Sequence, residues 1–320
     1  MNSFGRIFKV SLFGESHGDS IGVVIDGVPE GIALEREDFL FDIGRRAPGL
    51  KGTTARKESD EPVFLSGIYE GHTTGAPLAI VFRNENTRSA DYAQFDAMPR
   101  PGHADFVAAV KWDWENDPRG GGHFSGRLTL PLVAAGVVAK KVLEDIDIHA
   151  ELIEVGGEKD ASRWEALLEA AAQEGDSLGG IVECRVDNVP IGLGEPFFDS
   201  VESLISHAVF AMPGVRGIEF GDGFRAPRMK GSEHNDPFGP DGPAKNGAGG
   251  VNGGITNGAP IVFRVAVKPT SSIAKPQRTW NFKDKKMDTL SVKGRHDVCF
   301  ALRTPVVIEA LTALVLADLV

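Results

Sequence analysis

The chain has 320 residues, of which 42% are hydrophobic and 25% charged, and a formal net charge of −11. This apolar content can build a core and excludes a disordered polymer, while two cysteines are too few for a disulfide scaffold and fit a cytoplasmic protein. We expect no nucleic-acid partner, because the charge is negative, and neither a signal peptide nor a membrane span. An anionic small substrate requires cations that are concentrated locally.

Strand and helix patterns alternate along the chain. Short β-branched runs predict strands, and apolar residues at helical spacing predict helices. Ser162 and Glu165 have the spacing of a capping box, and Gly175 is placed to end the helix that follows it. In chain order we predict a strand at 21–25, a helix at 35–45, a strand at 79–82, helices at 129–143 and 162–175, a strand at 181–186, a helix at 201–211, a strand at 260–267 and a helix at 306–320.

This mixture predicts an α/β (mixed α+β) fold. We find no internal repeat and no linker, so we expect one domain over residues 1–320. Glycine is abundant, with 39 residues in clusters, which indicates unusual turns or backbone close to a ligand. The stretch 237–258 is rich in Gly, Pro and Asn, and a loop of that length is usually functional or disordered.

Residues 14–18, Gly-Glu-Ser-His-Gly, match the G-x-S-x-G pattern of serine hydrolases. That motif needs a helix after the turn, but a strand-like run follows here. Three interpretations stay open at this point: a nucleophile elbow using Ser16, a glycine turn with a solvated histidine, and a ligand loop in which Ser16 and His17 transfer protons.

Five cations lie within thirteen residues, with glycines among them: Arg45, Arg46, Lys51, Arg56 and Lys57. In an acidic protein this density exceeds what a solvated face needs, although such a face remains an alternative. Arginine forks match the geometry of phosphate and carboxylate groups. The cluster therefore indicates a site for an anion.

His103 directly follows a Pro-Gly turn in the sequence Arg-Pro-Gly-His-Ala-Asp at 100–105. Imidazole titrates near neutral pH, so a histidine beside a phosphate could protonate that group as it leaves. The alternative is a structural histidine.

A run of three glycines, 120–122, precedes Ser125, Arg127 and the predicted helix at 129–143. Glycines before a helix N-terminus are typical of a phosphate cradle, because free N–H groups and the helix dipole favour anions. The spacing is not that of a Walker loop. The sequence at 221–226 resembles a dinucleotide fingerprint, but Pro227 follows and no helix opens, so we reject it.

Two further segments near the C-terminus have residues suited to a phosphate or a proton. Lys268-Pro269-Thr270-Ser271-Ser272 follows a predicted strand and offers hydroxyls and one ammonium group. Asp297 adjoins His296 and Arg295, as either an ion pair or a base in a cleft. We find no metal-binding motif and expect no metal.

Taken together, these segments resemble the chorismate synthase family. The resemblance runs in order along nearly the whole chain and is weak only over about 145–205. Besides the motifs above, it is carried by residues 4–8, 28–31, 45–49, 65–75, 86–92, 134–136, 217–223, 249–255 and 294–297.

The resemblance implies a β-α-β sandwich fold and a homotetramer. It also implies the conversion of 5-enolpyruvylshikimate 3-phosphate to chorismate and phosphate in the shikimate pathway of aromatic amino-acid biosynthesis. That reaction is an anti-1,4-elimination that requires reduced FMN without net redox change. NADPH would enter only as a reductant of the flavin, and the missing dinucleotide fingerprint favours a separate flavin reductase.

Carried over by motif, His17 would keep the reduced flavin in its working protonation state and His103 would protonate the leaving phosphate. Asp297, relayed through Ser16, would help remove the C6 proton. The implied substrate-binding residues are Arg45, Arg46, Lys51 and Arg127. The implied cofactor-binding residues are Ser125, Pro213, Gly214, Gly253, Lys268, Pro269, Thr270, Ser271, Ser272 and Arg295. Three of these depart from the family pattern. Lys51 stands where arginine is common, and Pro213 and Gly214 belong to the segment 212–214, where an Asn-Ala pair is common.

Two other functions remain as alternatives. A serine hydrolase using Ser16 would be labelled by a fluorophosphonate and would need no flavin. A non-catalytic phosphate- or nucleotide-binding module would bind its ligand without turnover.

Overall fold

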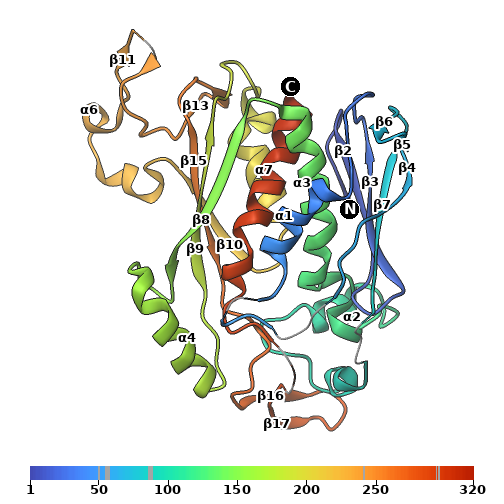
Figure 1. Ribbon diagram of the computed structural model, residues 1–320. Coiled ribbons are helices and arrows are strands. Elements are labelled where there is room, and N and C mark those ends of the chain that lie inside the picture. Colours follow the sequence, from blue (N-terminus) through green and yellow to red (C-terminus); the bar gives the residue numbers. More distant parts are fainter. Residues whose placement is uncertain (50, 55–57, 86–88, 241, 293, 295) are drawn as a thin grey trace.

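The computed structural model describes residues 1–49, 51–54, 58–85, 89–240, 242–292, 294 and 296–320. Two antiparallel sheets lie on opposite sides of a layer of helices (Figure 1). The first sheet has the order β1-β2-β3-β7-β4, formed by β1 (Ser3–Phe4), β2 (Lys9–Gly14), β3 (Ser20–Asp26), β7 (Leu78–Arg83) and β4 (Val63–Ser66). The second has the order β10-β15-β9-β8, formed by β10 (Val215–Phe220), β15 (Ile261–Val267), β9 (Gly180–Asp187) and β8 (Asp147–Val155).

Each sheet turns one apolar face toward the helices. In β3 the residues Ile21, Val23 and Ile25 are fully buried, and in β15 the same period of two buries Ile261 and Phe263. Side chains of a strand alternate between its faces, so this spacing fixes which face meets the helices.

The helix layer contains α1 (Glu37–Arg46), α3 (Thr129–Leu143), α5 (Val201–Val209) and α7 (Pro305–Leu319). Nearly every side chain of α7 is buried, as expected for a helix that is apolar on all sides and is covered by α3, α5 and the second sheet. Gly136 of α3 faces Ala310 of α7, and a Cβ at position 136 would lie 2.5 Å from the Ala310 Cα. The glycine therefore permits the close packing of the two central helices.

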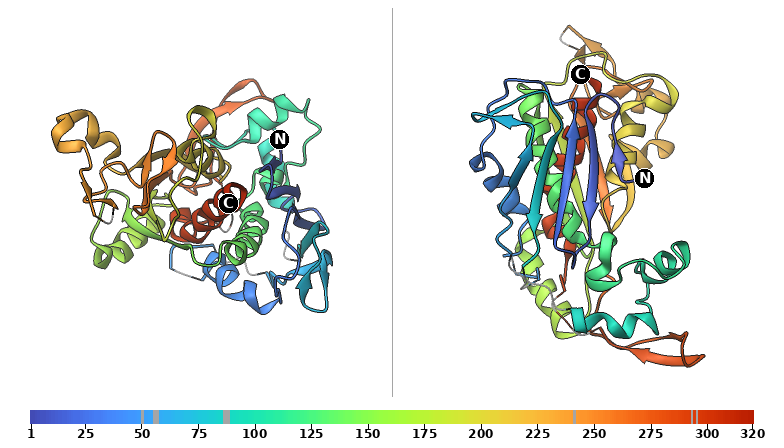
Figure 2. Two further views of the ribbon diagram at one scale, coloured as in Figure 1. Left: turned by 90° about the horizontal axis from the view of Figure 1, so that it is seen from above. Right: turned by 90° about the vertical axis from the view of Figure 1, so that its right-hand side faces the viewer.

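Smaller elements lie around the sandwich. Helix α2 (Asp105–Lys111) and the hairpin of β16 (Gln277–Asn281) and β17 (Lys286–Leu290) lie at the end where α7 begins (Figure 1, Figure 2). The remaining elements are α4 (Trp164–Gln173), α6 (Gly231–His234) and three short hairpins, β5 (Ile68–Tyr69) with β6 (His72–Thr73), β11 (Phe238–Gly239) with β12 (Gly242–Pro243), and β13 (Val251–Asn252) with β14 (Ile255–Thr256). Among the described residues no helix is both long and apolar enough to cross a bilayer.

The predicted fold class is confirmed, and each predicted helix and strand has a counterpart in the structure. The predicted capping box is wrong: α4 begins at Trp164, and the Ser162 amide and hydroxyl both donate to Asp160, at 3.0 and 2.7 Å. Asp160 caps a 3-10 turn that precedes the helix, so its carboxylate binds Ser162, which is then not available as the helix cap. Residues 15–19 join β2 to β3, so a strand follows Ser16 and the geometry of a nucleophile elbow is absent there.

Candidate active site

Segments that are distant in sequence line one cavity of about 710 Å³. Its walls come from the end of α1, the loop before α2, the glycine run before α3, the turn between α5 and β10, the loop after β15 and the loop before α7. The volume lies within the range of about 300–1,000 Å³ that is usual for small-molecule sites.

The cavity wall is cationic although the whole chain is acidic. Among its described lining residues are six arginines and lysines but three carboxylates. The cations are Arg46, Arg100, Arg127, Arg216, Lys268 and Arg303, and the carboxylates are those of Glu58, Asp60 and Asp297. The charge of the wall is therefore opposite to that of the whole chain. An acidic protein needs such a local concentration of cations to bind an anionic substrate.

Asp60 joins two of these arginines inside the wall. Its carboxylate accepts hydrogen bonds from Arg46 Nη2 at 2.8 Å and from Arg127 Nη1 at 2.5 Å. Burial opposes ionisation of Asp60, but the two guanidinium groups outweigh it and lower its pKa. Burial lowers the pKa of Arg46 to about 10, so this guanidinium remains charged at neutral pH. The arrangement presents two fixed positive groups to the cavity.

His103 lines the cavity and is anchored through Asp105. The His103 Nδ1 lies 2.6 Å from the Asp105 Oδ1, and Arg100 donates to the same carboxylate from Nη2 at 2.7 Å and from Nε at 2.8 Å. Burial raises the pKa of Asp105, but Arg100 and His103 together hold it well below its ordinary value. The ring is therefore fixed by an ionised carboxylate.

The glycine run passes between the two histidines. A Cβ at Gly120 would lie 2.6 Å from His17 Nε2 and 2.9 Å from Ser16 Oγ, whereas a Cβ at Gly121 would lie 3.5 Å from His103 Nε2. Gly120 lines the cavity, and the buried Ser16 and His17 lie directly behind it. All three glycines, 120–122, have positive φ, which explains why other residue types are unsuited here.

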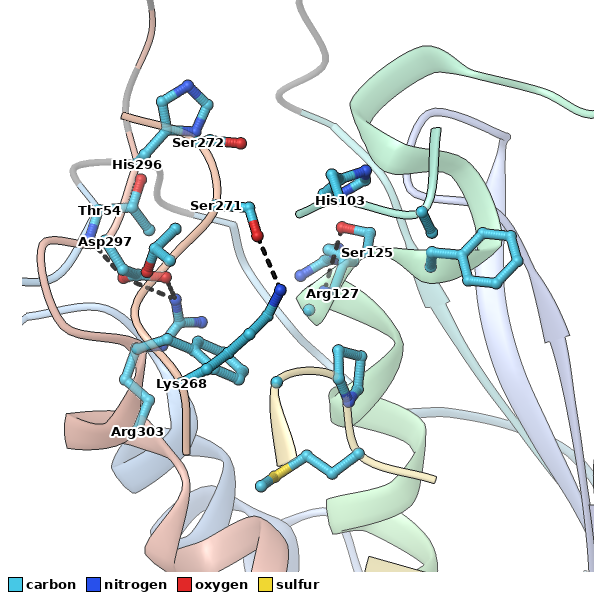
Figure 3. A pocket seen from close by; sticks show the side chains of 18 of the residues that line it. Thr54, His103, Ser125, Arg127, Lys268, Ser271, Ser272, His296, Asp297 and Arg303 are labelled. Carbon is cyan, nitrogen blue, oxygen red and sulfur yellow. Dashed lines mark hydrogen bonds and ion pairs between the residues drawn. The ribbon is translucent and has the colours of Figure 1, made fainter. Parts of the chain in front are cut away.

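The loop after β15 contributes an ammonium group and several hydroxyls, and Pro269 also lines the cavity (Figure 3). Lys268 Nζ donates to the Gly102 carbonyl oxygen at 2.5 Å and to Ser271 Oγ at 2.9 Å. Burial, followed by the charge of Arg216, lowers the pKa of Lys268. The buried Thr270 Oγ1 has no hydrogen-bond partner in the described part of the chain. This segment can accommodate further acceptor atoms from a ligand.

Asp297 faces the cavity from the loop before α7 (Figure 3). Its carboxylate accepts from the Thr54 amide at 2.8 Å and is paired with Arg303 Nη1 at 3.1 Å. Arg303 also donates from Nε to the Arg46 carbonyl oxygen at 2.8 Å. The carboxylate is therefore held rigidly at the start of α7.

Apolar residues complete the wall. Met212, Pro213 and Gly214 contribute the turn between α5 and β10, and Phe124 and Phe300 add aromatic surface. Ser125 and Arg127 lie on the wall beside Phe124. A cavity with apolar surface and a charged part suits a ligand with a flat ring and anionic groups.

Several of the expected site residues lie elsewhere. Arg45 points away from the cavity and donates to Glu309 from Nη1 at 2.6 Å and from Nη2 at 2.7 Å, because adjacent helix positions face about 100° apart. Lys51 is exposed and pairs with Glu165 and with Glu169 of α4. Gly253 forms the turn between β13 and β14, at the opposite end of the sandwich from β16 and β17 (Figure 1). Arg295 lies outside the described residues.

Sequence reasoning gave no role to Asp60, Arg100 or Arg303. Arg100 and Asp105 flank His103 closely enough in sequence to have been recognised as its partners. Asp60 lacked such a signal, because its contact with Arg127 joins segments 67 residues apart. Arg303 lies six residues after its partner Asp297, but its contact with the Arg46 carbonyl oxygen joins segments 257 residues apart.

Comparisons with known proteins show the family to which this chain belongs. The chorismate synthase family model matches residues 8–320. The chain is 62% identical to the chorismate synthase of Chitinophaga pinensis over 99% of this chain and 96% of that protein. It is 46% identical to that of Korarchaeum cryptofilum, over 98% and 96%. A crystal structure of a chorismate synthase superposes with a TM-score of 0.74 at 25% identity, covering 99% of this chain and 92% of that one. The chain therefore belongs to the chorismate synthase family and is a lyase of that kind.

Proposed function

We propose that the cavity described above is where 5-enolpyruvylshikimate 3-phosphate loses its phosphate, and that reduced FMN is the cofactor. The observation that carries this proposal is the cationic wall of an acidic protein. The substrate carries a phosphate and carboxylates, and positioned cations stabilise the charge that develops on a departing phosphate.

The fit of FMN rests on two features of the wall. The Thr270 hydroxyl, which has no partner among the residues that the structure describes, and the Lys268 ammonium group suit the phosphate tail, together with Ser271 and Ser272. The apolar surface of Met212, Pro213, Gly214 and Phe300 suits a flat ring. When bound, reduced FMN would supply electron density to the breaking allylic C–O bond and recover it afterwards.

Several polar residues in the wall and behind it have a proposed task. Arg46 and Arg127, fixed by Asp60, hold the anionic groups of the substrate. His103 donates a proton or a hydrogen bond to the phosphate as it leaves. Asp297, held by Thr54 and Arg303, serves the transfer of the C6 proton. His17 acts from behind Gly120 on the protonation state of the bound cofactor, and Ser16, next to His17, is the proposed relay of the C6 proton for Asp297.

We also propose an oligomeric state, a location and a source of electrons for the flavin. We infer a homotetramer and a cytoplasmic location, with the whole chain acting as one domain. NADPH would serve only as a reductant: a separate reductase would use it to reduce the flavin.

An anaerobic assay with dithionite-reduced FMN and the enolpyruvyl substrate tests the proposal. We expect stoichiometric chorismate and phosphate with reduced FMN, and neither product with oxidised FMN. Phosphate release without reduced flavin would contradict it, and labelling of Ser16 by a fluorophosphonate would favour the hydrolase alternative.

A further inference from the structure

The orientation of His103 depends on a residue that does not line the cavity. Asp105, the first residue of α2, has its Oδ1 2.6 Å from the Nδ1 of His103. Three donors of Arg100 fix the same carboxylate: Nη2 at 2.7 Å, Nε at 2.8 Å and the backbone amide at 3.0 Å. The carboxylate is thus held in place independently of the histidine.

These contacts assign the proton on the ring. An ionised carboxylate can only accept, so an Nδ1 at 2.6 Å from it must carry a hydrogen. Arg100 Nη2 also lies 3.2 Å from this Nδ1, but Arg100 can only donate, and it already donates to Asp105 at the shorter distance of 2.7 Å. With Nδ1 engaged, Nε2 is the ring nitrogen left for the cavity.

We propose that Asp105 is a positioning residue that holds the Nδ1–H of His103 and presents Nε2 to the departing phosphate. The imidazolium gives its Nε2 proton to the phosphate and is left as the neutral, Nδ1-protonated ring. The effect on turnover rests on the role proposed above for His103, whereas the protonation of Nδ1 does not. A histidine ring that is held through Nδ1 is already oriented. No free energy is therefore needed to reorient it before Nε2 transfers a proton.

Arg100 extends this unit to the loop after β15. Its Nη1 donates to Ser272 Oγ at 2.9 Å, and its guanidinium lies 4.6 Å from the centre of the Phe95 ring. Because Arg100 balances the charge of Asp105, the carboxylate acts mainly through geometry and hydrogen bonding.

Nitrogen-15 NMR of imidazole groups tests the tautomer directly in the cofactor-free protein. We would record spectra at about pH 8.5, well above the ordinary imidazole pKa of about 6.5, and assign His103 by comparison with His103→Ala. We expect the Nδ1-protonated form in the wild-type protein. In Asp105→Asn we expect that form to lose its dominance, because an amide can donate as well as accept. A neutral wild-type His103 whose single proton lies on Nε2, not on Nδ1, would overturn the proposal without reliance on any variant at Asp105.

A double-mutant cycle tests the consequence for turnover. We expect Asp105→Asn to lower kcat about 10- to 1,000-fold with little change in KM, bounded by the loss in His103→Ala, since general acids contribute about 10²–10⁴-fold. In the His103→Ala background the same substitution should cost nothing further. Equal losses in both backgrounds would overturn the proposal, because they would assign Asp105 a structural role.

Two controls separate the possible failures. Asp187→Asn removes a carboxylate that is likewise paired with an arginine, Arg185 on β9, and should leave kcat unchanged. If His103→Ala retains full turnover, the role proposed for His103 fails, while the NMR measurement still decides whether Asp105 fixes its tautomer.

Discussion

Two glycine-rich segments of this chain have similar compositions and different surroundings. At 119–126 two glycines face histidine side chains of the site: Gly120 faces His17 and Ser16, and Gly121 faces His103. At 245–258 Gly249 and Gly250 face backbone instead, and a Cβ at Gly250 would lie 2.5 Å from the Pro260 carbonyl oxygen. The first segment lines the cavity, whereas the second forms turns beside β15. Clustered glycine therefore indicates close approach, and the neighbouring side chains decide whether the approach serves chemistry or packing.

Gly120→Ala should break the first segment most severely. The new methyl group would push His17 and Ser16 from their positions, at a residue whose φ of +64° already disfavours a side chain. A misplacement of about 1 Å can cost about 100-fold in rate, so we expect kcat to fall by about that factor or more. Steady-state assays with reduced FMN would measure the loss.

Gly157→Ala is the matched control, because Gly157 has a φ of +91° and a Cβ there would meet nothing within 4 Å. It should cost about 1 kcal/mol of stability from backbone strain and leave kcat unchanged. Equal effects of both alanines on kcat would contradict a specific role for the space beside Gly120.

Adjacent arginines of α1 extend the comparison to charge. Arg46→Ala removes a cation from the cavity wall and should lower kcat/KM about 10- to 100-fold, the value of a charge-assisted hydrogen bond. Arg45→Ala instead deprives the buried Glu309 of two hydrogen bonds. We expect it to lower the free energy of unfolding by about 2 kcal/mol, with a smaller change in kcat/KM than Arg46→Ala gives. Urea unfolding and kinetics of both variants would show whether the two effects separate in this way.

Gly250→Ala probes the second segment. Its φ is +86°, and the added methyl group would clash with backbone at Pro260 and Ile261. We expect a loss of about 2–3 kcal/mol in the free energy of unfolding, while the folded fraction keeps its turnover. A fully stable variant with impaired turnover would show that this segment serves the reaction.

Local patterns predicted much of this fold and part of the site. The strand at 260–267 and the helix at 129–143 were predicted from the spacing of their apolar residues. A segment that is buried on one face or on all sides has a characteristic apolar spacing. His103 and the loop after β15 were predicted because their polar or ionisable side chains directly follow a turn or the end of a strand. Asp60 escaped prediction because its contact with Arg127 spans 67 residues. Arg303 lies near Asp297 in sequence, but its contact with the Arg46 carbonyl oxygen spans 257 residues. Arg45 was indistinguishable from Arg46 until the orientation of α1 was known.

Anaerobic turnover by His103→Ala tests most directly whether phosphate leaves within this cavity. With reduced FMN and the enolpyruvyl substrate, we expect kcat to fall about 100-fold or more, the contribution of a general acid, while the variant unfolds at the same urea concentration as the wild type. Chorismate formation at the wild-type rate would contradict the assignment of the departing phosphate to the wall formed by His103 and the glycine run.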